Sequence, residues 1–148
     1  MNKIRYSIFA DQDLFVAQTH GNISFDDLYQ HVLILMGDKE FKAGINALYD
    51  FSTITDFTGD LAKLEALAAG MSSEDVIVKK AKTAKTAILL PNEFAPNIHG
   101  VMEQYMAMTA SSQIDYRIFT LAEFKQAASF LGYDSLFLEG LLNFAFES

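Results

Sequence analysis

One stretch in the first half of the chain constrains the fold more than any other. Residues 45–49 form an apolar run that ends in Asp50-Phe51-Ser52, and a polar loop at 53–59 leads into a helical pattern that opens at Asp60. A parallel strand that is covered on both faces has an unbroken apolar run of this kind. Open α/β sheets place their ligand sites at the carboxyl ends of such strands. The stretch therefore predicts an α/β fold with residues 50–60 on its working surface.

Strand-like and helix-like patterns alternate along the rest of the chain. A tight turn at 11–13 predicts an N-terminal β-hairpin, and Gly21-Asn22 is expected to end its second strand. Ser24 is the expected N-cap of the first helix, while Thr120 and Glu123 form a capping box before the last helix of the alternation. Strands are expected at 6–10, 14–19, 45–52, 86–90 and 114–119, and helices at 25–36, 60–70, 76–82, 98–108 and 121–131. This order predicts a mostly parallel sheet of about five strands with helices wound around it.

The last fifteen residues differ from the rest. The 148-residue chain is most simply one domain, expected at 1–133, followed by an apolar C-terminal helix at 134–148. After Asp134 this tail has only two charged residues, Glu139 and Glu147. A helix that is apolar nearly all round must be buried. We expect it to pack on the domain or on a dimer mate; a movable cover over an apolar cavity, or a membrane contact, is the alternative.

Charge and residue usage exclude several classes of protein. The net charge of −8 argues against nucleic-acid binding, which needs a basic face. The absence of cysteine excludes disulfides and thiol catalysis, and no signal peptide or membrane-spanning run is present, so a cytoplasmic location is expected. The exception in charge is a lysine cluster, which forms either a solvated helix end or a contact for an anionic partner or membrane: Lys79, Lys80, Lys82 and Lys85.

Few residues suggest catalysis. Asp50 and Asp56 flank the 53–59 loop and could bind magnesium or act as acid and base, but loop and cap hydrogen bonding is the simpler interpretation. The hydroxyl-rich loop before a helix start would also suit an anion or a phosphorylated side chain. His20, His31 and His99 share no metal-ligand spacing, and His31 is expected on the polar side of the first helix. We therefore predict no metal, no cofactor and no enzymatic activity, with a hydrolase the least favoured reading.

Several local strings, in their order and spacing over about residues 4–132, resemble the SpoIIAA-like family, relatives of STAS domains. The strings are Leu48-Tyr49-Asp50-Phe51, Asp56-Phe57-Thr58-Gly59, Thr86-Ala87-Ile88-Leu89-Leu90-Pro91-Asn92, Gly100-Val101-Met102-Glu103, Arg117-Ile118-Phe119 and Ala127-Ala128-Ser129-Phe130-Leu131-Gly132.

The resemblance implies a non-enzymatic binding or regulatory module. STAS-type anti-sigma-factor antagonists carry Asp-Ser-Ser-Gly with the second Ser phosphorylated, so the resemblance makes Thr58 the phospho-acceptor, with Phe57 departing from the pattern. The SpoIIAA-like branch is also similar in fold to lipid-carrying CRAL-TRIO domains, which makes a carrier of an apolar ligand the alternative function. The predicted ligand or partner surface comprises Asp50, Ser52, Asp56, Phe57, Thr58, Gly59, Asn92 and Phe94.

Overall fold

The computed structural model describes residues 4–42, 45–58, 84–93, 98, 100, 103 and 114–146. In this part of the chain the strands are β1 (Arg5–Phe9), β2 (Leu14–Ser24), β3 (Asn46–Thr58), β4 (Ala84–Leu90) and β5 (Ile114–Thr120). The helices are α1 (Phe25–Met36), α5 (Phe124–Leu131) and α6 (Ser135–Phe146), with 3-10 turns η1 (Ala10–Gln12) and η2 (Leu121–Glu123). The strands form one sheet in the order β1-β2-β3-β4-β5, in which β1 pairs antiparallel with β2 and all other pairs are parallel. The predicted N-terminal hairpin and mostly parallel five-stranded α/β sheet are confirmed.

The prediction of a loop at 53–59 is wrong, because β3 continues as a strand to Thr58. β2 likewise runs past Gly21-Asn22 to Ser24 and pairs in parallel with this extension of β3. The pairing of β2 with β3 contains two register shifts, and one of them is next to Gly21. Gly21 has a φ of +67°, a backbone conformation that glycine adopts without strain. Because of these irregularities the buried residues of the extension are Phe51, Ile54 and Phe57, spaced by three. That spacing hid the alternation by which strands are recognised in a sequence.

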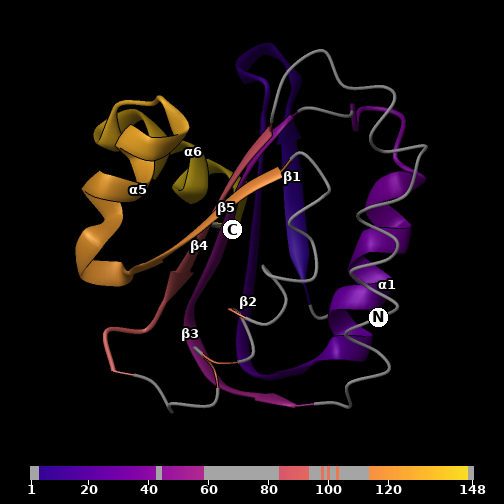
Figure 1. The fold of residues 1–148 in the computed structure, drawn as a ribbon. Coiled ribbons are helices and arrows are strands. Elements are labelled where there is room, and N and C mark those ends of the chain that lie inside the picture. Colours follow the sequence, from indigo (N-terminus) through magenta and orange to yellow (C-terminus); the bar gives the residue numbers. More distant parts are fainter. Residues whose placement is uncertain are drawn as a thin grey trace.

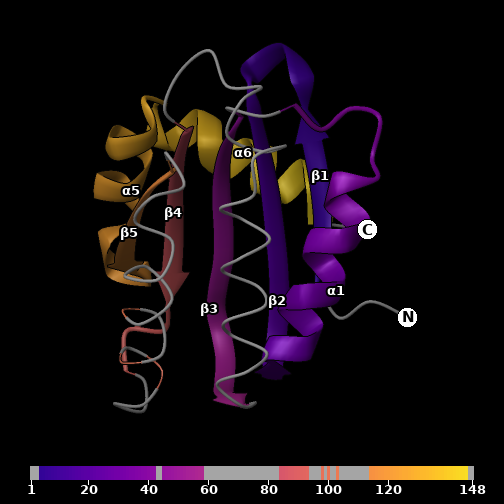
Figure 2. The ribbon, with the colours of Figure 1, turned by 45° about the vertical axis from the view of Figure 1, so that its right-hand side comes forward.

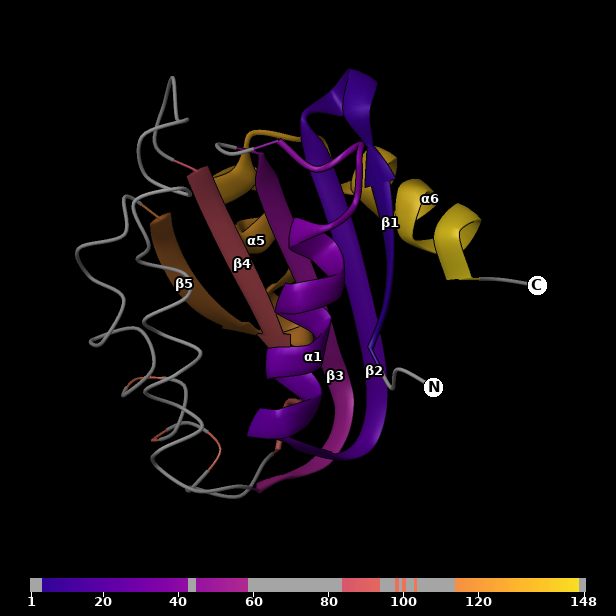
Figure 3. The ribbon, with the colours of Figure 1, turned by 90° about the vertical axis from the view of Figure 1, so that its right-hand side faces the viewer.

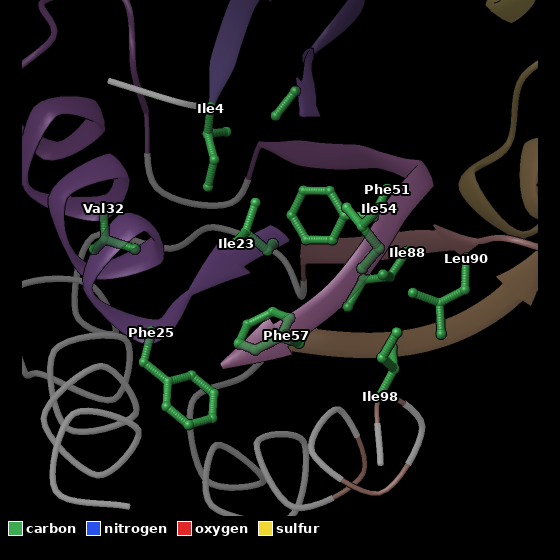
Figure 4. Close-up of a cluster of buried hydrophobic side chains, with 11 residues drawn as sticks. Ile4, Ile23, Phe25, Val32, Phe51, Ile54, Phe57, Ile88, Leu90 and Ile98 are labelled. Carbon is green, nitrogen blue, oxygen red and sulfur yellow. The ribbon is translucent and has the colours of Figure 1, made fainter. Parts of the chain in front are cut away.

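Apolar cores lie on both faces of the sheet, with α1 on one face and α5 and α6 on the other (Figures 1, 2 and 3). Figure 4 shows the larger core on the α1 face, where Phe25 of α1 meets Phe57 and Ile98 lies beside Leu90. On the opposite face Leu138 of α6 belongs to the core that also holds the following residues: Leu14, Val16, Leu48, Ala87, Leu89, Ala127, Ala128 and Leu131. Both faces of β2, β3 and β4 are thus covered, as the apolar run at 45–49 predicted for β3.

The helix boundaries follow the capping signals of the sequence. Ser24 caps α1 in a complete capping box with Asp27. Thr120 and Glu123 form the second box, which here opens the short turn η2 before α5. Gly132 ends α5 in the left-handed conformation, with its backbone N–H bonded to the carbonyls of Ala128 and Ser129. The predicted caps are therefore confirmed.

The expected apolar C-terminal helix is present as α6 and packs on the domain through Leu138, while much of its surface is exposed in the single chain. Packing of that surface on a dimer mate stays a prediction. Leu138 is the one residue of α6 that is fully buried. Leu136 is 77% exposed, Phe137 42% and Phe144 79%. α6 contacts the sheet along one side only, because no further layer of the described structure covers its other side.

Several predicted segments fall outside the described residues. These are the helices at 60–70 and 76–82 and most of the helix at 98–108, of which the described residues Ile98, Gly100 and Glu103 are helical.

Candidate functional site

A row of polar side chains crosses the first three strands on the face covered by α6. Arg5 donates to Gln18 Oε1 at 2.8 Å, and Gln18 Nε2 donates to Asp50 Oδ2 at 3.0 Å. The other carboxylate oxygen of Asp50 accepts from the backbone N–H of Ser52 at 3.1 Å and from its hydroxyl. Both oxygens of Asp50 are therefore bonded within the chain, which fits structural hydrogen bonding better than an open magnesium or acid–base site.

The other predicted site residues of β3 have different environments. Phe57 is 3% exposed, and its ring centroid lies 4.9 Å from that of Phe25 in the core (Figure 4). Asp56 accepts from the backbone N–H of Phe57 at 2.8 Å. Thr58 ends β3 and is exposed, with its hydroxyl 3.4 Å from Asn22 Oδ1. A partner could therefore reach Thr58 but not Phe57, and the role of Thr58 as phospho-acceptor stays a prediction.

The remaining predicted residues do not gather at one place. Asn92 follows β4, and its Oδ1 accepts from the backbone N–H of Ala122 at 2.8 Å, which ties the end of β4 to η2. Lys85 lies on β4 with its ammonium 5.4 Å from the ring centroid of Phe130. The following predicted residues lie outside the described part of the chain: Gly59, Lys79, Lys80, Lys82 and Phe94.

His31 was predicted on the polar side of the first helix, and that prediction is wrong. The residue is fully buried, and its ring packs against those of Tyr6, Phe15 and Tyr49 at centroid distances of 5.7, 6.5 and 5.5 Å. His31 Nε2 lies 3.0 Å from the hydroxyl of Tyr49, while Nδ1 has no hydrogen-bond partner among the described residues. Burial lowers the pKa of His31 to about 4, so the imidazole is neutral at physiological pH.

Polar partners surround this aromatic cluster. Burial and a 2.7 Å hydrogen bond to Asp38 raise the pKa of Tyr6 to about 12. The same hydrogen bond lowers the pKa of the Asp38 carboxyl. His20, by contrast, is exposed, with Nδ1 2.7 Å from Thr53 Oγ1, and His99 lies outside the described residues. The two described histidines are thus in unrelated environments.

Several large apolar side chains of α6 are exposed, on the tail for which the sequence predicted packing or, as the alternative, a cover or a membrane contact. We define the α6 surface as Leu136, Phe137, Gly140 and Phe144, all of which are exposed. Glu139 and Asn143 occupy the neighbouring strip of the helix and are exposed as well. The repeat of Leu136, Gly140 and Phe144 at intervals of four places them on one line along the helix.

The rest of α6 holds this surface in place. Arg5 lies over the ring of Phe146, 5.3 Å from its centroid, and the ring of Phe9 lies 6.3 Å from that of Phe144. Asp134 accepts from the backbone N–H of Phe137 at 3.2 Å and so caps the start of α6. α6 is therefore fixed to β1 at one end and capped at the other, although most of its outer side is bare.

A hollow of about 350 Å³ adjoins the α6 surface. Phe137 and Leu141 of α6 form one wall, and the end of β1 with η1 forms the other. Its lining residues are Ile8, Phe9, Ala10, Asp11, Gln12, Glu40, Phe137 and Leu141. The hollow thus combines apolar walls with two carboxylates, and no Lys, Arg or His is among these residues.

The described residues offer little for metal chemistry. They contain no cluster of three or more His, Asp or Glu side chains that could hold a metal ion. Nor is any described helix both long and apolar enough to cross a membrane.

Comparison with known proteins returned no match: no family model, no curated protein and no solved structure is significantly similar to this chain.

Proposed function

We propose that this protein is a non-enzymatic binding module of the SpoIIAA-like, STAS-related kind, and that it recognises a protein partner through the α6 surface. The observation that carries the proposal is the exposure of Leu136 and Phe144, at 77% and 79%, on a helix that is otherwise docked. Covering a large apolar side chain contributes about 1.5–3 kcal/mol. Contiguous exposed apolar residues beside a polar rim mark interaction sites in monomeric proteins.

The arrangement of the sheet supports a binding role over a hydrolytic one. Ser52 donates its hydroxyl proton to Asp50, whose other carboxylate oxygen accepts from Gln18, so this pair is held by hydrogen bonds within the chain. The predicted surface around residues 50–60 is also a weaker candidate than α6, because Phe57 is in the core. The proposed recognition surface therefore moves from the end of β3 to α6.

Site-specific photo-crosslinking in cells tests the proposal. A photoreactive amino acid replaces Leu136 in one variant and Gln126, which is exposed on α5, in the control. We expect discrete adducts with another protein from position 136, and few from position 126. Adding Phe144→Asp to the first variant should remove them. Equal adduct patterns at both positions, or none from position 136, would contradict a recognition role for α6.

A carrier of a small apolar molecule is the second candidate, and the hollow beside Phe137 favours it. Its volume of about 350 Å³ falls at the lower end of the range for small-molecule sites. Native mass spectrometry of the purified full chain distinguishes the two functions. A retained small molecule that is lost on Leu141→Asp supports the carrier, while an unliganded chain that still forms crosslinks from position 136 supports the recognition module.

A further inference from the structure

The α6 surface has a notch at its centre. Gly140 lies between Leu136 and Phe144, one helical turn from each, and a Cβ added there would meet no atom within 4 Å. Glycine inside a helix weakens it relative to alanine, and packing within the described chain does not require glycine at this position. Two large exposed side chains with a gap between them form a hole of the kind that receives a side chain from a neighbouring helix.

The surroundings of this notch are acidic on the side of the hollow. Asp11 and Glu40 line the hollow next to Phe137, and Glu139 is exposed on α6 itself, whereas Arg5 lies at the other end of the helix, over the ring of Phe146. The chain as a whole carries a net charge of −8. A ligand that covered the α6 surface would therefore be attracted if it carried positive charge and repelled if it carried negative charge.

From the notch and the charge together we infer that the α6 surface binds a basic amphipathic helix. One large apolar side chain of this helix sits at Gly140, between Leu136 and Phe144, and its Lys or Arg residues face Asp11 and Glu40. This inference rests on the proposed function and adds the chemical class of the partner. Helices that lay an apolar stripe on a matching surface are a recurrent mode of recognition.

Other occupants of the surface fit the charges less well. A second copy of this chain would bring its own Asp11, Glu40 and Glu139 towards the same acidic groups. An anionic membrane would be repelled for the same reason. A cationic helix is the occupant that both the apolar stripe and the acidic rim favour.

The test uses two model helices of equal length and equal apolar spacing, one built from Leu and Lys and the other from Leu and Glu. Each is titrated into the isotopically labelled full chain, and amide chemical shifts are followed at low and at physiological salt. We expect the Leu/Lys helix to shift the amides of α6 and η1 and to bind at least about tenfold more tightly than the Leu/Glu helix at low salt. The difference should narrow as salt screens the charges.

Substitutions distinguish the contribution of the notch to binding from that of the acidic residues. Gly140→Leu fills the notch and should weaken binding of the Leu/Lys helix about tenfold without unfolding the chain, because the added side chain has open space. Asp11→Asn with Glu40→Gln should remove most of the preference for the Leu/Lys helix. The matched control, Asp26→Asn with Glu93→Gln, changes the net charge equally at exposed positions elsewhere and should leave the preference in place.

Each other outcome overturns the inference in a distinct way. If both model helices bind α6 equally well, the partner is not required to be basic, and the proposed recognition function still holds. If neither Gly140→Leu nor the double variant at Asp11 and Glu40 changes the affinity for the Leu/Lys helix, the helix is attracted only by the overall negative charge of the protein. Dimers that dissociate on Gly140→Leu in light-scattering measurements identify a second copy as the occupant. If neither helix binds while crosslinks still form from position 136, the partner class is wrong and the recognition surface stands.

Discussion

α1 and α6 are both twelve-residue helices packed against the same sheet, on opposite faces, yet they are buried to very different extents. α1 buries four residues, Phe25, His31, Val32 and Leu35, whereas α6 buries only Leu138. α6 nevertheless has the more apolar sequence, with a single charged residue, Glu139. The more apolar helix is thus the less buried one.

The difference shows that burial is set by how many sides of a helix meet a partner, not by how apolar the helix is. α1 packs its inner side on a long core and places even a histidine there. α6 follows the sheet only along its Leu138 side. The apolar residues left over on α6 are surplus to folding, which is why we assign them to recognition.

The largest effect is expected at Leu138, the one fully buried residue of α6. Leu138→Ala should lower the free energy of unfolding by about 2–5 kcal/mol, because it leaves a cavity in the core next to the sheet. Leu136→Ala, two residues away and 77% exposed, should change it by less than about 0.5 kcal/mol. Urea denaturation of the two variants measures both values. Similar losses in both would mean that the outer side of α6 is covered in solution.

The next effect concerns the buried histidine of α1. The ordinary pKa of His31 is 6.5 and burial lowers it to about 4, so between these pH values the unfolded chain binds a proton that the folded chain does not. Stability should therefore fall as the pH falls from 6.5 towards 4, by up to about 1.4 kcal/mol per pH unit and about 3 kcal/mol in all.

Urea denaturation at several pH values measures this slope. His31→Leu should flatten the dependence on pH, whatever it does to stability at neutral pH, where Tyr49 loses a hydrogen-bond partner. His20→Gln, at an exposed histidine outside the core, is the matched control substitution. An unchanged slope in the His31→Leu variant would contradict the buried, neutral state of His31.

Removing the N-terminal caps of α1 and α6 should affect the two helices differently. Ser24→Ala removes the capping box of α1, and Asp134→Ala removes the cap of α6; each should cost about 1 kcal/mol. Because α6 has one fully buried anchor, Asp134→Ala should appear mainly as faster amide hydrogen exchange within α6. Ser24→Ala should instead lower global stability. Exchange that increases throughout the molecule in Asp134→Ala would show that α6 is as integral to the fold as α1.

The smallest effect is expected at the notch. Gly140→Ala should raise the free energy of unfolding by about 0.5–1 kcal/mol, because alanine favours the helix and the added methyl group meets open space. The same variant should bind the Leu/Lys model helix less tightly than the natural chain, although more tightly than Gly140→Leu. Stability measured by denaturation and binding measured by titration should thus move in opposite directions. If the variant is more stable and binds the Leu/Lys helix equally well, the claim that Gly140 serves binding is contradicted.

Local signals in the sequence were enough for the sheet and the helix ends. The apolar run at 45–49 predicted a central buried strand, which the structure shows as part of β3. The capping residues Ser24 and Thr120 and the terminating Gly132 each act within a few residues, so their effects are visible in the sequence alone. The extension of β3 to Thr58 was missed because its pairing with β2 depends on register shifts that no local pattern records.

The sequence predicted single residues of the candidate site but not how they come together. The apolar character of the tail was evident, and so was the polarity of Asp50 and Ser52. The sequence could not show that Phe57 would turn into the core or that Phe137 would meet the end of β1 beside Asp11. Phe137 and Asp11 are more than a hundred residues apart in the chain, and Phe57 and Phe25 lie on different elements.

Periodicity and contacts between near neighbours were sufficient to predict the sheet strands, the capped ends of the described helices and the apolar C-terminal helix. How completely each helix is covered depended on the tertiary structure. It placed His31 of α1 among the rings of Tyr6, Phe15 and Tyr49, and it left Leu136 and Phe144 of α6 in solvent. The physical reason is that an apolar side chain gains free energy from any surface that excludes water, and the sequence of one helix does not state which surface the rest of the chain will present to it.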